Sequence, residues 1–209
     1  YNAHHLYLHL RSRRHPHICK RDNPYSQPQM MQTLLKQNNL KSIKKMTNYF
    51  IDREEENGRW KDLPKKEDER LLFFLKKQLD SFAKIVATFE DDYIFCWLDW
   101  DGDNVLMDGG IIDYGSIRQF GMYHHGYQFD DDGTFSISIA EQKRKARYII
   151  QTFIQLVDAI MKDEKTNIKE FSQHDLLKEF DLKFEDYKNQ NILRKIGFEE
   201  HLVDSLVKG

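Results

Sequence analysis

A short apolar segment with a glycine-rich turn at its centre separates two polar side chains in the middle of the chain. Residues 105–107 (Val-Leu-Met) and 111–112 (Ile-Ile) are strand-forming runs, and residues 108–110 (Asp-Gly-Gly) between them are typical of a tight turn. Pairing of the two runs would bring the carboxamide of Asn104 and the carboxylate of Asp113 together at the open end of the ribbon. The sequence therefore predicts a small β-hairpin that carries two oxygen ligands side by side.

The composition is that of a globular protein with one sizeable core. The chain has 209 residues, of which 40% are hydrophobic, so one domain is expected, with a small appendage possible. A net charge of -2 gives no strong nucleic-acid footprint, and no apolar run approaches the roughly 18 residues needed to span a bilayer. Two cysteines are too few for a disulfide framework. We expect a cytoplasmic protein without nucleic-acid or membrane partners.

Hydrophobic periodicity predicts mostly helices around the hairpin. The first 28 residues contain three prolines and are expected to form an irregular arm or the remnant of an interlobe segment. The expected elements after it are one or two helices over 29–49 with a polar interruption at 37–39, a loop over 52–66, a long helix over 65–89, a helix that begins at Ile139 or Ala140, and two or three short helices over 166–209.

The two polar side chains are suited to a metal-bound nucleotide. Carboxylate and carboxamide oxygens are hard ligands of the kind that Mg²⁺ takes. In protein kinases, an Asn of the catalytic loop and the Asp of an Asp-Phe-Gly motif have this role. Asp113 begins the variant Asp-Tyr-Gly at 113–115, in which the Gly still frees the backbone and the Tyr supplies an aromatic plug. Asn104 and Asp113 are the candidate ligands of Mg²⁺ or Mn²⁺, and with it of ATP.

The segment around this motif resembles the catalytic core of the selenoprotein O family. The resemblance covers roughly residues 70–160 and is carried by Phe-Cys at 95–96, Asp-Asn at 103–104, the nine-residue step from Asn104 to Asp113, and the stretch 126–135. It implies an α+β fold that is mostly α, namely a protein-kinase-like C-terminal lobe with a small β-hairpin. The lobe would span residues 29–209, with a catalytic loop at 95–104 and an activation-type segment at 116–138.

The selenoprotein O family consists of kinase-fold protein adenylyltransferases that were long classed as pseudokinases. The resemblance therefore implies transfer of AMP from ATP to Ser, Thr or Tyr hydroxyls of a protein substrate (AMPylation), with ATP bound in the reverse of its orientation in kinases. Carried over position by position, Asp103 matches the family's general base. Asn104 and Asp113 match its metal ligands.

The chain departs from the family pattern just before Asp103. Trp97 stands where the family has His, and residues 99–101 (Asp-Trp-Asp) stand where it has Val-Met-Asn. Asp99 thus lies five residues before Asn104, which is the position of the base in the kinase pattern H-R-D-x-x-x-x-N. Asp99 and Asp103 are both candidate bases, and Asp99 would suit a kinase-like phosphotransferase.

No Gly-rich phosphate loop and no nucleotide-binding Lys with its Glu partner are recognisable in the sequence. Since a kinase-like enzyme needs an N-terminal lobe to cover the nucleotide, we expect the chain to be a C-terminal lobe that is inactive without its N-lobe. Three alternatives stay open. The lobe could be a catalytically dead pseudokinase that serves as a binding module. The acidic residues 99–104 could form a metal-free surface turn, or a Ca²⁺ loop, although they lack the Gly and Glu positions of an EF-hand.

Overall fold

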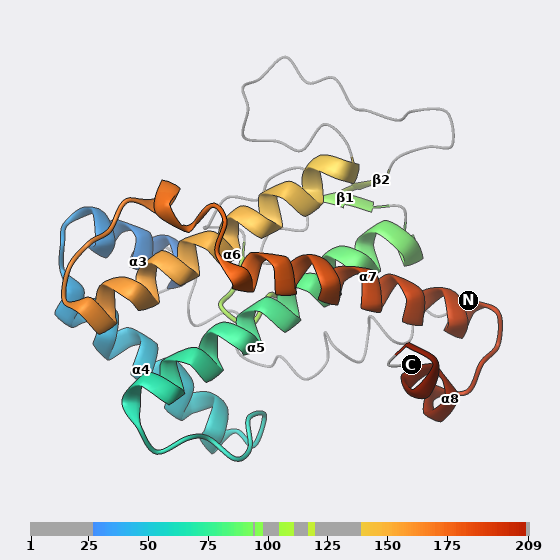
Figure 1. Ribbon diagram of the computed structural model, residues 1–209, viewed down its shortest axis with the longest axis horizontal. Helices are drawn as coiled ribbons and strands as arrows, with labels where there is room; N and C mark the ends of the chain where they lie inside the picture. The colour runs from blue at the N-terminus through green and yellow to red at the C-terminus, as the bar shows by residue number, and fades with distance from the viewer. Residues whose placement is uncertain (1–26, 94, 98–104, 111–116, 120–138, 208–209) are drawn as a thin grey trace.

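The chain folds into a bundle of helices with a two-stranded sheet beside it (Figure 1). The computed structural model describes residues 27–93, 95–97, 105–110, 117–119 and 139–207. The elements are α3 (Gln27–Lys36), α4 (Leu40–Glu56), α5 (Glu67–Thr88), the π-helix η1 (Phe89–Tyr93), β1 (Phe95–Trp97), β2 (Ile117–Gln119), α6 (Ile139–Lys162), the 3-10 helix η3 (Ile168–Phe171), α7 (Asp175–Lys195) and α8 (Glu200–Val207). The prediction of a mostly helical chain is confirmed.

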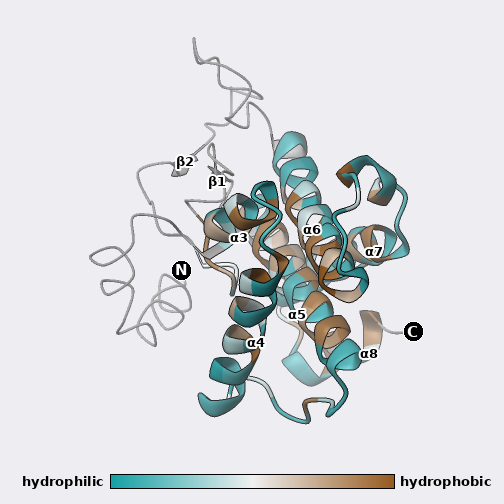
Figure 2. Cartoon of the chain, turned by 90° about the vertical axis from the view of Figure 1, so that its left-hand side faces the viewer, coloured by the Kyte–Doolittle hydropathy of each residue, from teal (hydrophilic) through white to brown (hydrophobic). Residues whose placement is uncertain are grey.

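Helix α5 is the central element of the bundle. Its apolar side chains recur every three or four residues, which places them on one face and explains why α5 packs along both α6 and α7. Acidic residues fill its first turn, where their negative charges interact favourably with the positive end of the helix dipole. Figure 2 shows hydrophobic stretches where α5, α6 and α7 lie together. The long helix predicted over 65–89 and the helix predicted from Ile139 are confirmed.

Aromatic rings join the helices at the centre of the core. Phe74 of α5 is fully buried and lies edge-to-face with Phe50 of α4, at 6.0 Å between ring centroids, and with Phe153 of α6, at 5.8 Å. Edge-to-face pairs of this kind add to the burial of apolar area, because the positive edge of one ring meets the negative face of the next. Three helices are thus held around one side chain.

Helix α4 is longer than predicted. The polar interruption before it is confirmed, since Asn39 is its N-cap and accepts a hydrogen bond from the amide of Ser42 at 3.2 Å. The prediction of a loop from residue 52 is wrong, because the helix continues to Glu56. Its last turns are charged, but Ile51 and Glu54 are buried there and pack against the rest of the bundle.

The C-terminal part also differs from the prediction. Instead of only short helices, α7 forms one helix of 21 residues, followed by the 8 residues of α8. Buried residues of α7 such as Leu177, Phe180 and Phe184 face α5, and this contact extends along much of α7. At the other end of the chain, α3 begins at Gln27, slightly before the predicted boundary, because a proline such as Pro28 is tolerated in the first turn of a helix.

Among the described residues, no helix is both long and apolar enough to cross a membrane.

Candidate active site

The four residues that the sequence singles out lie outside the described part of the chain. Asp99, Asp103 and Asn104 belong to residues 98–104, and Asp113 belongs to residues 111–116. The structure does describe the three segments that flank them, namely β1, the turn at 105–110 and β2. These segments border the two stretches that carry the candidate residues, 98–104 and 111–116, which are called the two arms below.

Strands β1 and β2 close one end of this region. They pair antiparallel, with Phe95 opposite Gln119, Cys96 opposite Arg118 and Trp97 opposite Ile117. Trp97 and Ile117, which border the intervening segment 98–116 in the sequence, are therefore neighbours in the sheet. The sheet lies near the start of α6 (Figure 1), and β1 contacts both η1 and α6. This pairing was not among the elements expected from the sequence, although Phe-Cys-Trp is a short run of strand-forming type.

The turn at 105–110 lies between the two arms in the sequence and is held by two backbone hydrogen bonds. The amide of Leu106 donates to the carbonyl of Gly110 at 2.7 Å, and the amide of Gly109 donates to the carbonyl of Leu106 at 2.9 Å. This pattern encloses a three-residue hairpin loop, whose last residue, Gly109, has the positive φ of 79° that such loops require. The predicted tight turn is confirmed. Residues 111–112 lie outside the described residues, so the hairpin strands remain a prediction.

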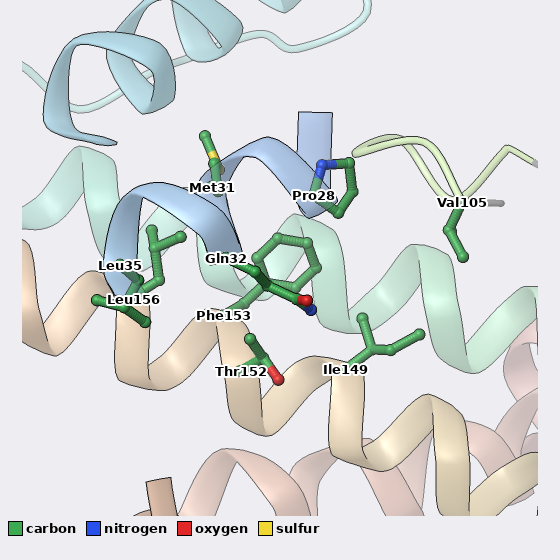
Figure 3. A pocket seen from close by; sticks show the side chains of 9 residues that line it. All are labelled: Pro28, Met31, Gln32, Leu35, Val105, Ile149, Thr152, Phe153 and Leu156. Atoms are coloured by element: carbon green, nitrogen blue, oxygen red, sulfur yellow. The ribbon is translucent and has the colours of Figure 1, made fainter. Parts of the chain in front are cut away.

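The turn is anchored inside the protein. Val105 is 2% exposed and Met107 is fully buried, and both belong to the main hydrophobic core. A β-carbon on Gly109 would lie 2.8 Å from Cδ1 of Ile85 in α5, so only glycine fits without a shift of Ile85. Val105 lines a small cavity together with residues of α3 and α6 such as Pro28 and Ile149 (Figure 3). The volume of this cavity is about 20 Å³. This cavity has room for about one water molecule, far less than a nucleotide needs.

An arginine links the turn to α4. Nη1 of Arg59 lies 3.1 Å from Oε2 of the buried Glu54 and 3.4 Å from Oδ2 of Asp108. The other oxygen of Asp108, Oδ1, accepts a hydrogen bond from the amide of Gly110 at 3.0 Å. Asp108 thus stabilises the turn internally and connects it to α4.

Helix α7 holds the segment that leads into β1. Nζ of Lys188 lies 2.7 Å from Oε1 of Glu90 and 3.6 Å from Oδ1 of Asp91, and Nζ of Lys195 donates to the backbone carbonyl of Asp91. Burial raises the pKa of Asp91 above its ordinary value of 3.8 despite the two lysines. Burial also opposes the charged form of Lys188, but Glu90 and Asp91 outweigh it and raise the pKa of Lys188 above 10.5. These contacts fix η1, the π-helix directly before β1.

Within the described ranges, no group of three or more His, Cys, Asp or Glu side chains is placed to bind a metal ion. Comparisons of the chain with known protein families, with curated proteins and with solved structures found no match.

The close approach of Gly109 to α5 gives a first prediction. Gly109→Ala should lower the free energy of unfolding by about 2 kcal/mol, because it combines an unfavourable φ with the contact to Ile85. Gly58→Ala is the matched control, since Gly58 has a φ of 68° but nothing within 4 Å of the added β-carbon, and should cost only about 1 kcal/mol. Urea unfolding measures both. Equal losses would show that the turn does not press against α5.

The α7 contacts give a second prediction. Lys188→Met should lower the free energy of unfolding by about 1 to 3 kcal/mol, because it leaves the largely buried Glu90 without its cation and Asp91 with Lys195 alone. Since the pKa of Lys188 is raised, its contribution is fully present at neutral pH and is lost only as the pH rises through the raised value. Lys178→Met, which removes an exposed ion pair with Asp175, is the control and should cause no measurable loss. Thermal unfolding at pH 7 compares the two variants, and similar midpoints would contradict a structural role for Lys188.

Proposed function

We propose that the chain is the C-terminal lobe of a kinase-like protein adenylyltransferase, similar to selenoprotein O, that transfers AMP from ATP to protein hydroxyls. One observation supports this proposal above the others. The segment 98–116, which contains every candidate site residue, is bordered by paired residues of β1 and β2. Its middle is held by a buried three-residue turn. A metal and phosphate site needs ligands that are held in place by the surrounding fold, and these anchors on both sides of the candidate residues would meet that need.

The register of the turn bears on the ligand geometry. Leu106 is opposite Gly110, so a ladder continued from this pair would set residue 105 opposite 111 and residue 103 opposite 113. Residues 103, 104 and 113 would then gather at one end of the ribbon. Because side chains alternate along a strand, Asn104 and Asp113 can share one cation only if the regular pairing that starts at the turn does not extend to residue 104. The proposal therefore requires that the ladder be broken between Val105 and Asn104.

The donor chemistry fits a divalent cation. Asn104 offers a carboxamide oxygen and Asp113 offers carboxylate oxygens, which are ligands that Mg²⁺ and Mn²⁺ accept. Such a cation, when bound, neutralises phosphate charge. With only two protein ligands, the remaining positions would be available to phosphate oxygens and water, as is usual for Mg²⁺.

The proposed reaction is a single displacement at the α-phosphorus of ATP. The hydroxyl oxygen of a Ser, Thr or Tyr side chain of the substrate forms the new bond to the α-phosphorus, and the bond from the α-phosphorus to the bridging oxygen breaks. Pyrophosphate leaves with that oxygen, and Asp103 accepts the hydroxyl proton. A base in this role must lie within about 2.6 to 3.2 Å of the oxygen it deprotonates.

A second candidate function is transfer of the γ-phosphate. The spacing of Asp99 and Asn104 favours it, since this is the spacing of base and metal ligand in protein kinases. The chemistry differs only in which phosphorus is attacked and in the product that leaves, which would be ADP.

A third prediction separates these functions. The intact protein, meaning the proposed C-terminal lobe together with its N-lobe, is incubated with Mg²⁺, substrate proteins and ATP labelled at the α- or the γ-phosphate. We expect label from the α-phosphate only, and Asp113→Ala and Asn104→Ala should each reduce it by about 100-fold or more, because a ligand of the charge-neutralising cation is lost. Asp175→Asn, an exposed carboxylate on α7, is the control and should have no effect. Label from the γ-phosphate would support the kinase activity, and nucleotide or partner binding with no label would support a pseudokinase module.

The base is tested by a fourth prediction. Asp103→Ala should leave ATP affinity within about threefold of the unmodified protein and reduce the rate of transfer by about 100-fold or more, because a general base acts only in the transition state. Asp99→Ala should retain most of the activity. Calorimetric titration with an ATP analogue and single-turnover assays measure the two quantities. The assignment fails if the effects of the two substitutions are reversed.

A further inference from the structure

The linker between α4 and α5 contains a side chain that bridges two carboxylates from distant parts of the chain. Arg59 contacts Glu54, which is five residues earlier, and Asp108, which is 49 residues later. The first partner is in the last turns of α4, and the second is in the three-residue loop of the buried turn. Arg59 therefore connects the helical bundle to the side chain that stabilises this loop.

Glu54 fixes the position of this connection. Its side chain is only 2% exposed, and Arg53 donates to its Oε1 from Nε at 3.1 Å and from Nη2 at 2.8 Å. A buried carboxylate is stable only when it is fully paired, so Glu54 requires both arginines. Because Arg53 occupies Oε1, Oε2 is left for Arg59.

The backbone of the linker is fixed as well. The carbonyl of Glu54 accepts hydrogen bonds from the amides of Arg59 at 3.0 Å and Trp60 at 3.1 Å. The ring of Trp60 lies edge-to-face with Phe50 of α4, at 5.5 Å between centroids, and with Phe73 of α5, at 5.7 Å. The guanidinium of Arg59 thus extends from a rigid base, although 44% of its side chain is exposed.

We infer that Arg59 is a positioning residue, which holds the 105–110 turn through Asp108 and thereby fixes the two points, Val105 and Gly110, from which the chain continues on either side. The effect on the turn follows from the described contacts alone. The consequence for metal and nucleotide binding rests on the proposed function, since Asn104 lies one residue before the turn and Asp113 three residues after it. Small displacements of ligands from their productive geometry have large effects on binding and rate.

The first measurement does not depend on the proposed function. In Arg59→Met, hydrogen exchange at the amides of Leu106 and Gly109, which donate the two backbone-to-backbone hydrogen bonds of the turn, should accelerate by about 3- to 10-fold. Arg70→Met is the matched control, because Arg70 also joins α4 to α5 but does so by pairing with Asp52 at 2.5 Å rather than with a residue of the turn. It should leave these two exchange rates unchanged. Equal rates in Arg59→Met and the unmodified protein would overturn the inference.

The second measurement tests the consequence for the site. Mn²⁺ is titrated into the intact protein in the presence of ATP, and the bound metal is followed by electron paramagnetic resonance. We expect about 10-fold weaker Mn²⁺ binding in Arg59→Met and partial recovery in Arg59→Lys, because an ammonium group reaches either carboxylate but does not bridge both as a guanidinium does. Faster exchange with unchanged Mn²⁺ affinity would reduce Arg59 to a stabilising residue and overturn its positioning role. Failure of the unmodified protein to bind Mn²⁺ with ATP would instead contradict the proposed function, while the exchange result still decides whether Arg59 holds the turn.

Discussion

Burial of the turn at 105–110 in a helical core is the constraint on which the arrangement of this protein depends. Loop segments usually run over the surface, but here Met107 is fully buried and Val105 nearly so, and Gly109 leaves no space for a side chain against α5. The backbone groups of a buried turn must be paired, and the hydrogen bonds from Leu106, Gly109 and Gly110 provide this pairing. The chain on either side of the turn therefore begins from a fixed position.

Electrostatic contacts secure both ends of the same region. At the turn, Arg59 joins Asp108 to the buried Glu54. Near β1, Lys188 of α7 joins Glu90 to Asp91, whose pKa is raised by burial. In both places one cation pairs with two carboxylates that are largely withdrawn from water. Pairs of this kind add little net stability compared with apolar packing, but they are costly to break, so they favour one geometry over others.

Local pattern was sufficient for some elements and insufficient for others. The apolar periodicity of α5 and α6 and the Asp-Gly-Gly turn carry their own signal, and each was predicted close to its observed position. The continuation of α4 to Glu56 buries Ile51 and Glu54 against the rest of the bundle, which the charged pattern of these residues does not indicate. The pairing of β1 with β2 joins strands that are separated by residues 98–116, so neither three-residue run predicts it alone. The roles of Asp99, Asp103, Asn104 and Asp113 remain predictions, because these residues lie outside the described ranges.

The two candidate bases are next to different described segments in the sequence. Asp99 is two residues beyond Trp97 in the sequence, and Trp97 is held by the β1–β2 pair, next to the η1 segment that α7 contacts. Asp103 is two residues before Val105 in the sequence, and Val105 belongs to the buried turn that Asp108 links to Arg59. Two residues of extended chain span at most about 7 Å, so we expect each base to depend on the anchor next to it in the sequence. Disturbance of the turn should therefore impair chemistry that uses Asp103 more than chemistry that uses Asp99, whereas disturbance of the contacts between α7 and η1 should have the opposite effect. Under the proposed function, with Asp103 as the base for transfer of AMP and Asp99 as the base for transfer of phosphate, the two reactions would depend on different anchors, and each anchor can be altered without touching either carboxylate.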